Sequence, residues 1–119
     1  MATVTHSTNE VTIDAAGVPI GRLASRVATV VRGKDRPDYE PYKLPKIIVR
    51  ISNISKMKIS EAKVESKFHY RYTKYPGGLK KDYWKNLISR PEKLFLLVLN
   101  NMLPKNTHQK QILKNIKFV

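Results

Sequence analysis

Apolar residues recur at helical spacing in two parts of the chain. Positions 20, 23, 24, 27, 30 and 31 are apolar, which predicts an amphipathic helix from residue 20 to about residue 33. A second helix is expected after Pro91, because proline is tolerated in the first helical turn, and Pro104 must end it. Residues 94–99 of this helix are apolar almost all round, so we expect the helix to lie buried between layers.

Other apolar runs have the composition of β-strands. Residues 11–14 form a short strand candidate, and residues 47–51 are β-branched and nearly continuous, as in a strand that helices cover on both faces. Arg50 interrupts the second run, so we place it near an open end of the sheet. A closing strand is expected at residues 116–119, whereas residues 56–59 fit either a further short strand or a bend. Strands that alternate with helices predict an α/β fold with a partly parallel sheet.

The remaining segments are predicted from turn and capping residues. Residues 1–10 are polar without a period and are expected to form a flexible arm. Residues 35–45 are expected to be an extended loop, because the spacing of their three prolines forbids a helix. Asp82 is a candidate cap for a short helix over residues 83–89, and a last short helix is expected at residues 106–115.

One stretch, residues 66–81, combines aromatic, basic and glycine residues. Its first half alternates, so a strand would carry aromatics (Phe68, Tyr70, Tyr72) on one face and cations on the other. We expect the aromatic face to pack and the cationic face to meet an anion. A tight loop flanked by lysines follows, built from Lys74, Pro76, Gly77, Gly78, Lys80 and Lys81. Such a loop can approach a phosphate backbone closely, and the alternative of a solvated edge strand ending in an ordinary turn stays open.

The charge of the chain points to a polyanionic partner. Its 119 residues hold 23 Lys and Arg against 9 Asp and Glu, a net charge of +14 at pH 7. Residues 1–42 are neutral overall, so the excess lies from Lys43 onward, and the anion-binding surface is expected mainly there. Self-repulsion of this size favours nucleic acid as the first partner and an anionic membrane surface as the second. Apolar residues make up 41%, enough for one folded domain over residues 11–119.

Several classes of protein are disfavoured by composition. The sequence has no cysteine, which removes disulfides and thiolate metal sites and fits a reducing compartment. The longest apolar run, residues 94–99, is too short to span a membrane, and residues 1–10 lack the basic start and apolar centre of a signal peptide. We therefore expect a soluble, cytoplasmic protein without a membrane partner.

Catalysis and metal binding are not expected. The histidines His6, His69 and His108 are scattered, and no pair has the spacing of two ligands on one metal. His69 fits better as a hydrogen-bond donor to a phosphate or sugar. Asp14 ends the first strand, where a catalytic or cofactor carboxylate could lie, but a structural acid paired with a neighbouring arginine is favoured. No nucleotide-binding glycine motif is complete, so no cofactor and no small-molecule substrate are expected.

Several short strings follow one another in a fixed order. They are Ile13-Asp14-Ala15 with Gly21-Arg22-Leu23-Ala24-Ser25, Val31-Arg32-Gly33-Lys34, Tyr70-Arg71 leading to Tyr75-Pro76-Gly77-Gly78-Leu79-Lys80, Pro91-Glu92, and Met102-Leu103-Pro104-Lys105-Asn106. The Tyr-Pro-Gly-Gly-Leu-Lys and Met-Leu-Pro-Lys-Asn strings are the most specific. With these strings, about residues 11–119 resemble the universal large-subunit ribosomal protein thirteen family, in its bacterial or organellar form.

The resemblance implies a structural ribosomal protein. Its fold would be a three-layer α/β/α domain with a small, mainly parallel, about four-stranded sheet. Its partners would be large-subunit ribosomal RNA and neighbouring ribosomal proteins, with a role early in subunit assembly and no enzyme activity or cofactor. Matching positions imply RNA contacts at Arg22, Arg32, Lys34, Arg71, Tyr75, Gly77, Gly78, Lys80, Lys105 and Asn106. The basic stretches add His69, Lys74, Lys81 and Lys110 to the RNA-binding candidates.

The chain also departs from the family pattern. Residues 108–110 read His-Gln-Lys where the family usually has Leu-Gly-Arg, and the sequence ends at Val119 without a polar tail, so we expect a smaller RNA footprint. Two other function classes stay as alternatives. One is a free-standing RNA- or DNA-binding regulatory module, and the other is a small phosphate-processing enzyme that uses Asp14 or His69.

Overall fold

The computed structural model describes residues 4–6 and 9–119, with side chains from Asn9 onward. Its elements are β1 (Val4–His6), β2 (Glu10–Asp14), α1 (Ile20–Val31), β3 (Ile48–Ser52), a 3-10 turn η1 (Ile54–Lys56), α2 (Glu61–Ser66), β4 (Phe68–Tyr72), β5 (Leu79–Tyr83), α3 (Trp84–Leu87), α4 (Pro91–Met102), α5 (Gln109–Lys114) and β6 (Ile116–Phe118). This mixed composition confirms the predicted α/β class.

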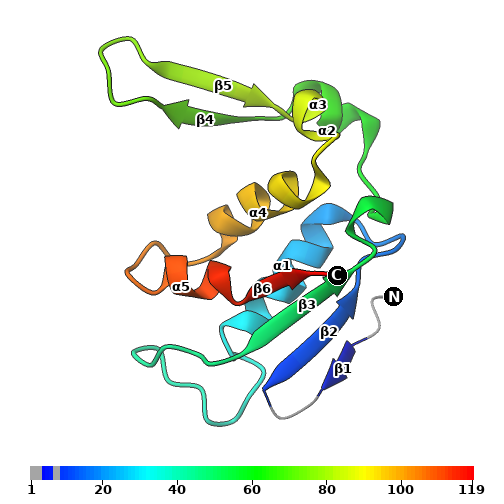
Figure 1. The fold of residues 1–119 in the computed structure, drawn as a ribbon, viewed down its shortest axis with the longest axis vertical. Coiled ribbons are helices and arrows are strands. Elements are labelled where there is room, and N and C mark those ends of the chain that lie inside the picture. Colours follow the sequence, from blue (N-terminus) through cyan, green and yellow to red (C-terminus); the bar gives the residue numbers. More distant parts are fainter. Residues whose placement is uncertain (1–3, 7–8) are drawn as a thin grey trace.

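A four-stranded sheet forms the base of the molecule, in the order β1-β2-β3-β6 (Figure 1). Strands β2, β3 and β6 are parallel, and β1 pairs antiparallel with β2. The small, mainly parallel sheet is therefore confirmed. Within the stretch predicted as a flexible arm, Val4–His6 forms the edge strand β1 and Glu10 begins β2; residues 1–3 and 7–8 of that prediction lie outside the described residues.

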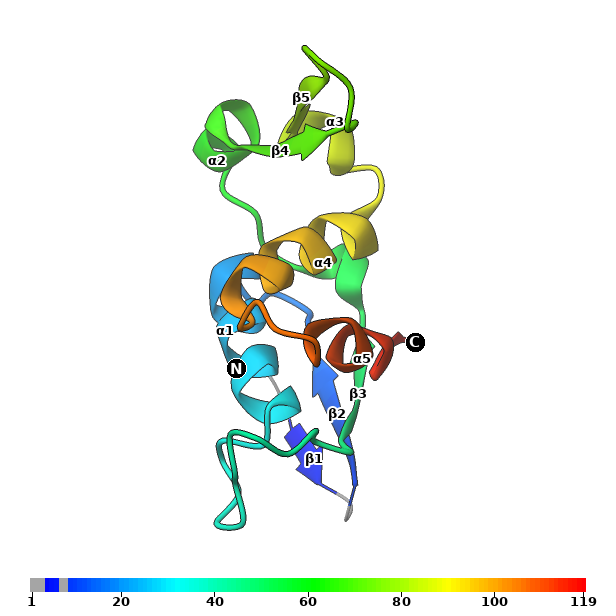
Figure 2. The same ribbon diagram turned by 90° about the vertical axis from the view of Figure 1, so that its left-hand side faces the viewer.

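Helix α1 packs on one face of this sheet (Figure 2). Buried and exposed residues alternate in β2 and β3, and the buried set is Val11, Ile13, Val49 and Ile51. On the opposite face Thr12, Arg50 and Lys117 lie in register and are exposed. The predicted third layer is thus not found in the described chain, and the prediction of a strand covered on both faces was wrong. Arg50 lies in mid-sheet, because only every second residue of the β-branched run faces the core.

Helix α4 supplies the centre of the core. Leu94, Phe95 and Leu99 are fully buried, and α4 packs against α1. The ring of Phe95 meets that of Phe118 on β6 edge-on, with centroids 6.1 Å apart. The predicted helix between Pro91 and Pro104 is present, but only Leu94, Phe95, Val98 and Leu99 are buried, so α4 buries one side against α1 and β6 rather than lying between layers. In the described residues no helix is long and apolar enough to cross a membrane.

A second, two-stranded sheet, β4–β5, projects away from the core at the far end of the molecule from the four-stranded sheet (Figure 1). Strand β4 lies in the predicted stretch, whereas the return strand β5 was missed. Asp82 lies within β5, so its predicted role as a helix cap was wrong; α3 is shorter than the helix expected at residues 83–89. Of the two alternatives for residues 56–59, the structure shows a bend with a single bridge between Pro19 and Lys58.

Candidate nucleic-acid interface

The outer face of α1 is cationic and hollowed. Arg22 and Arg26 are exposed there, one turn apart, and the hydroxyls of Ser25 and Thr29, which line the same hollow, donate to the carbonyls four residues earlier. Lys63 of α2 completes the walls of an open groove of about 610 Å³ on this face. Figure 2 shows α2 and α1 on the same side of the molecule. The groove therefore brings together cations from two separate segments.

The groove continues toward the end of α1. Arg32 and Lys34 line an adjoining hollow of about 350 Å³, together with Met102 of α4. Gly33 has φ +76°, so it ends the helix in the left-handed conformation that glycine adopts without steric cost. Arg32 donates from Nη2 to the hydroxyl of Tyr39, 3.4 Å away, which ties the following loop to the helix.

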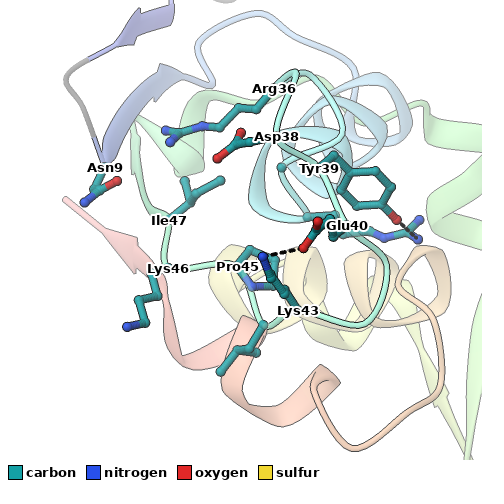
Figure 3. A pocket seen from close by; sticks show the side chains of 12 residues that line it. Asn9, Arg36, Asp38, Tyr39, Glu40, Lys43, Pro45, Lys46 and Ile47 are labelled. Carbon is teal, nitrogen blue, oxygen red and sulfur yellow. Dashed lines mark hydrogen bonds and ion pairs between the residues drawn. The ribbon is translucent and has the colours of Figure 1, made fainter.

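The loop after α1 encloses a separate pocket of mixed charge (Figure 3). This pocket has a volume of about 200 Å³ and is lined by both acids and bases. Lys43 forms an ion pair with Glu40, and Arg36 and Asp38 lie on the opposite side (Figure 3). Two carboxylates offset part of the charge of its four cations, whereas no acid lines the α1 groove, so this pocket is a poorer anion site than the groove.

The tip of the β4–β5 hairpin is a type II β-turn. Gly78 N–H donates to Tyr75 O at 2.9 Å, Pro76 occupies the second position, and Gly77 in the third has φ +73°. A side chain on Gly77 would meet open space, whereas a Cβ on Gly78 would lie 1.9 Å from Oγ1 of Thr73. The Cβ position of Gly77 thus faces open space, while that of Gly78 faces Thr73. The N–H of Gly78 is engaged within the turn, so an RNA contact at Gly78, which stays a prediction, would not use this group.

Exposed cations surround this turn. Lys74 has φ +66° and, like Lys80 and Tyr75, is exposed. Arg71 faces Asp82 across the hairpin, with Nε 3.4 Å from Oδ2, and both lie on the same face of the sheet as Lys80. This exposed ion pair fixes the Arg71 side chain more than it stabilises the fold.

The aromatic face of the hairpin does not pack on the core, contrary to the prediction. Tyr70 and Tyr72 are each 61% exposed. The ammonium of Lys81 lies 4.8 Å from the ring centre of Phe68 and 5.9 Å from that of Tyr70. Phe68 pairs with Tyr83 and Tyr70 with Lys81, so these four residues share one face of the hairpin. His69 and Asp82 pair on the opposite face and are half-buried.

His69 anchors the hairpin rather than facing outward. Trp84 Nε1–H donates to His69 Nε2 at 3.0 Å, the rings stack at 6.1 Å, and Asn101 of α4 lies 3.5 Å from Nδ1. Burial lowers the pKa of His69; nearby Asp82 opposes this shift and Lys67 adds to it. Neutral His69 is required to accept the indole hydrogen bond. Its predicted role as a donor to phosphate is therefore not supported by the geometry.

The third group of candidates lies between α4 and α5. Lys105 and Asn106 are exposed there, and Lys110 is exposed in the first turn of α5. The side-chain oxygen of Asn106 accepts the backbone N–H of His108 at 3.1 Å, which forms a local Asx turn. Gln109 Nε2 donates to Asn100 at both its carbonyl oxygen and its Oδ1, so this loop is pinned to α4.

Asp14 has a structural role. Its Oδ1 accepts hydrogen bonds from Asn53 Nδ2 and from the backbone N–H of Ala16, both at 3.0 Å. Asn53 first, then Ala16, hold the pKa of Asp14 below its usual range. The expected structural acid is present, but its partners are an amide and a turn N–H rather than an arginine. Within the described part of the chain, no three His, Asp or Glu residues are grouped as metal ligands.

The predicted RNA-binding residues thus fall into three groups: the α1 groove, the hairpin, and the loop before α5 with the first turn of α5. The structure adds Arg26 and Lys63 to the first group. The helical period already placed Arg26 on the exposed side of α1, so a signal for it existed. Lys63 had none, because only the fold brings α2 beside α1.

An α/β domain with unbalanced cations in grooves and on a projecting hairpin is typical of small nucleic-acid-binding proteins. The family model for ribosomal protein L13 matches residues 8–119, and the chain belongs to this family. The large ribosomal subunit protein uL13 of Petrotoga mobilis is 40% identical over 106 residues, which cover 88% of this chain and 70% of the relative. The uL13 protein of Thermus thermophilus is 40% identical over 108 residues, which cover 90% and 77%.

Proposed function

We propose that the chain is a structural component of the large ribosomal subunit and binds its ribosomal RNA without catalysing a reaction. One observation carries the proposal. Among the described residues, the ion pairs use only Lys43, Arg50 and Arg71 of the cations, so those of the α1 groove have no acidic partner in the chain. Family membership supports the ribosomal setting, because the matched relatives are named as uL13 of the large subunit.

The three groups of cations serve one purpose in this proposal. Ribosomal RNA neutralises the excess charge that opposes folding of the free chain, and release of counterions drives the association. The α1 groove follows a sugar-phosphate strand, while the hairpin tip and residues 105–110 contact further phosphates. Binding of this kind orders RNA segments and supports an early step of large-subunit assembly, beside neighbouring ribosomal proteins. Because the matched relatives are bacterial, we place the chain in a cytoplasmic ribosome.

Purification of large subunits from cells that express the tagged chain tests this function. We expect one copy per subunit, measured by quantitative mass spectrometry. The purified chain should also bind the large-subunit ribosomal RNA of the same organism with an affinity that falls steeply as salt rises. Absence from subunits, together with selective binding to a messenger RNA or to DNA, would favour the free-standing regulatory module instead.

A further inference from the structure

The hairpin carries an exposed aromatic face that the contacts described so far leave unused. Residues at matching positions of β4 and β5 share this face, namely Phe68, Tyr70, Tyr72, Leu79, Lys81 and Tyr83. Tyr70 and Tyr72 are each 61% exposed, and Leu79 is 60% exposed. Large apolar side chains gathered on a projecting sheet are uncommon without a partner. We propose that this face is a stacking platform for unpaired nucleotides of the ribosomal RNA, an inference that rests on the proposed function.

The geometry of the face suits bases that are splayed apart. Tyr70 and Tyr72 are alternate residues of one strand, so their side chains leave the backbone about 6.6 Å apart. That spacing is about twice the 3.4 Å rise between stacked bases of a helical strand. A base-paired helix cannot offer its bases to both rings, whereas a loop or bulge can. Proteins commonly recognise single-stranded RNA by stacking such bases on aromatic side chains.

The charge of the face favours RNA over a protein partner. Lys81 lies among the rings, close to Phe68 and Tyr70. The hairpin's acid, Asp82, is on the opposite face and is paired with Arg71. A protein that covered the aromatic face would have to bring an acid to Lys81, because the hairpin offers none on this face and an unpaired buried charge is costly. An RNA strand brings its own phosphate to the ammonium while its bases reach the rings.

Tyrosine variants of the full-length chain separate stacking from charge. Each of Tyr70→Ala and Tyr72→Ala should weaken binding to the large-subunit ribosomal RNA transcript by about fivefold to a hundredfold. The slope of log affinity against log salt should not change, because no cation is lost. Tyr70→Phe and Tyr72→Phe keep the rings and should bind like the wild type. Selective acylation of 2′-hydroxyls should show a few unpaired nucleotides that the wild type protects and the alanine variants do not.

The outcomes distinguish this inference from the function on which it rests. If both alanine variants bind the RNA and protect it as the wild type does, the stacking platform is wrong while the proposed function stands. If they keep RNA affinity but no longer enter large subunits, the face binds a protein instead, which also overturns the inference. If the wild type itself does not bind the RNA, both proposals fall. The fluorescence of Trp84 at the base of the hairpin checks that the variants are folded.

Discussion

Trp84 donates its indole N–H to Nε2 of His69, 3.0 Å away, and this bond joins the hairpin to the rest of the domain. Trp84 is buried on α3, and Asn101 of α4 lies beside the second ring nitrogen of His69. The hairpin is therefore held at its base by a polar contact, while its tip and aromatic face stay exposed. A rigid base fixes where the exposed residues point.

Low pH should weaken the hydrogen bond between Trp84 and His69. Because the pKa of His69 is lowered in the folded state, the unfolded chain takes up a proton first as the pH falls. The stabilising effect is complete above the ordinary histidine pKa of 6.5 and is lost as the pH falls below it. Trp84 is the one tryptophan of the sequence, so its fluorescence should report a transition with a midpoint below 6.5. His69→Gln should remove this transition and His108→Gln should leave it; persistence in His69→Gln would contradict the assignment.

Gly77 should resist replacement by residues with a Cβ. Its φ of +73° costs an ordinary residue about 1–2 kcal/mol, although no neighbour would clash with the added atom. Gly77→Ala should therefore lower hairpin stability and slow incorporation into large subunits. Gly77→Asn is the matched control, because asparagine tolerates the left-handed region. Hydrogen exchange of the β4–β5 amides measures the effect, and equal exchange in Gly77→Ala and wild type would refute the turn argument.

Arg26 and Lys63 should contribute to RNA affinity through charge alone. Each of Arg26→Ala and Lys63→Ala should reduce the slope of log affinity against log salt by about 0.7 to 0.9, the contribution of one phosphate contact. Lys117 lies on the uncovered face of the four-stranded sheet, away from the groove, so Lys117→Ala serves as control. Titrations at several salt concentrations measure the slopes. If the slope changes for Lys117→Ala but not for the other two variants, the RNA binds the uncovered face of the four-stranded sheet and not the α1 groove, which would contradict the prediction.

Phe95→Ala should destabilise the whole domain. The side chain is fully buried and packs edge-on against Phe118, so its loss leaves a cavity between α4 and β6. Changes of this kind cost about 3–5 kcal/mol, which urea unfolding measures. Phe118→Ala is the comparison, and its cost should be smaller because Phe118 is only partly buried. Equal costs would contradict this expectation and indicate that Phe118 of β6 contributes as much to this part of the core as Phe95 of α4.

The sequence predicted well the elements whose signal is local. The 3.6-residue period marked α1, and two prolines bounded α4. Strand β5 was missed because its residues, Leu79 to Tyr83, are mostly polar and pair only with the distant β4. Aspartate is a common helix cap, but Asp82 instead lies in β5 and forms an ion pair with Arg71 across the hairpin. Such cross-strand contacts depend on tertiary structure and leave little mark on local composition.

In the candidate site, too, the features with a local sequence signal were predicted and those that depend on tertiary structure were not. Alternation correctly separated the aromatic and cationic faces of β4, yet which face packs depends on how the hairpin joins the domain. The bond between His69 and Trp84 turns the histidine face inward and leaves the tyrosines exposed. The uncovered face of the sheet was missed for a related reason. A β-branched run looks continuous in sequence, although Arg50 already marked the face that no helix of the described residues covers.

Lysine acetylation of intact large subunits, read by mass spectrometry, tests the central claim most directly. Lysines of the groove and hairpin, Lys34, Lys63, Lys74 and Lys80, are all exposed in the free chain and should react readily there. In the subunit we expect these four lysines to be protected and to become reactive again after the RNA is digested with ribonuclease. Equal reactivity in the free chain and in the subunit would contradict it.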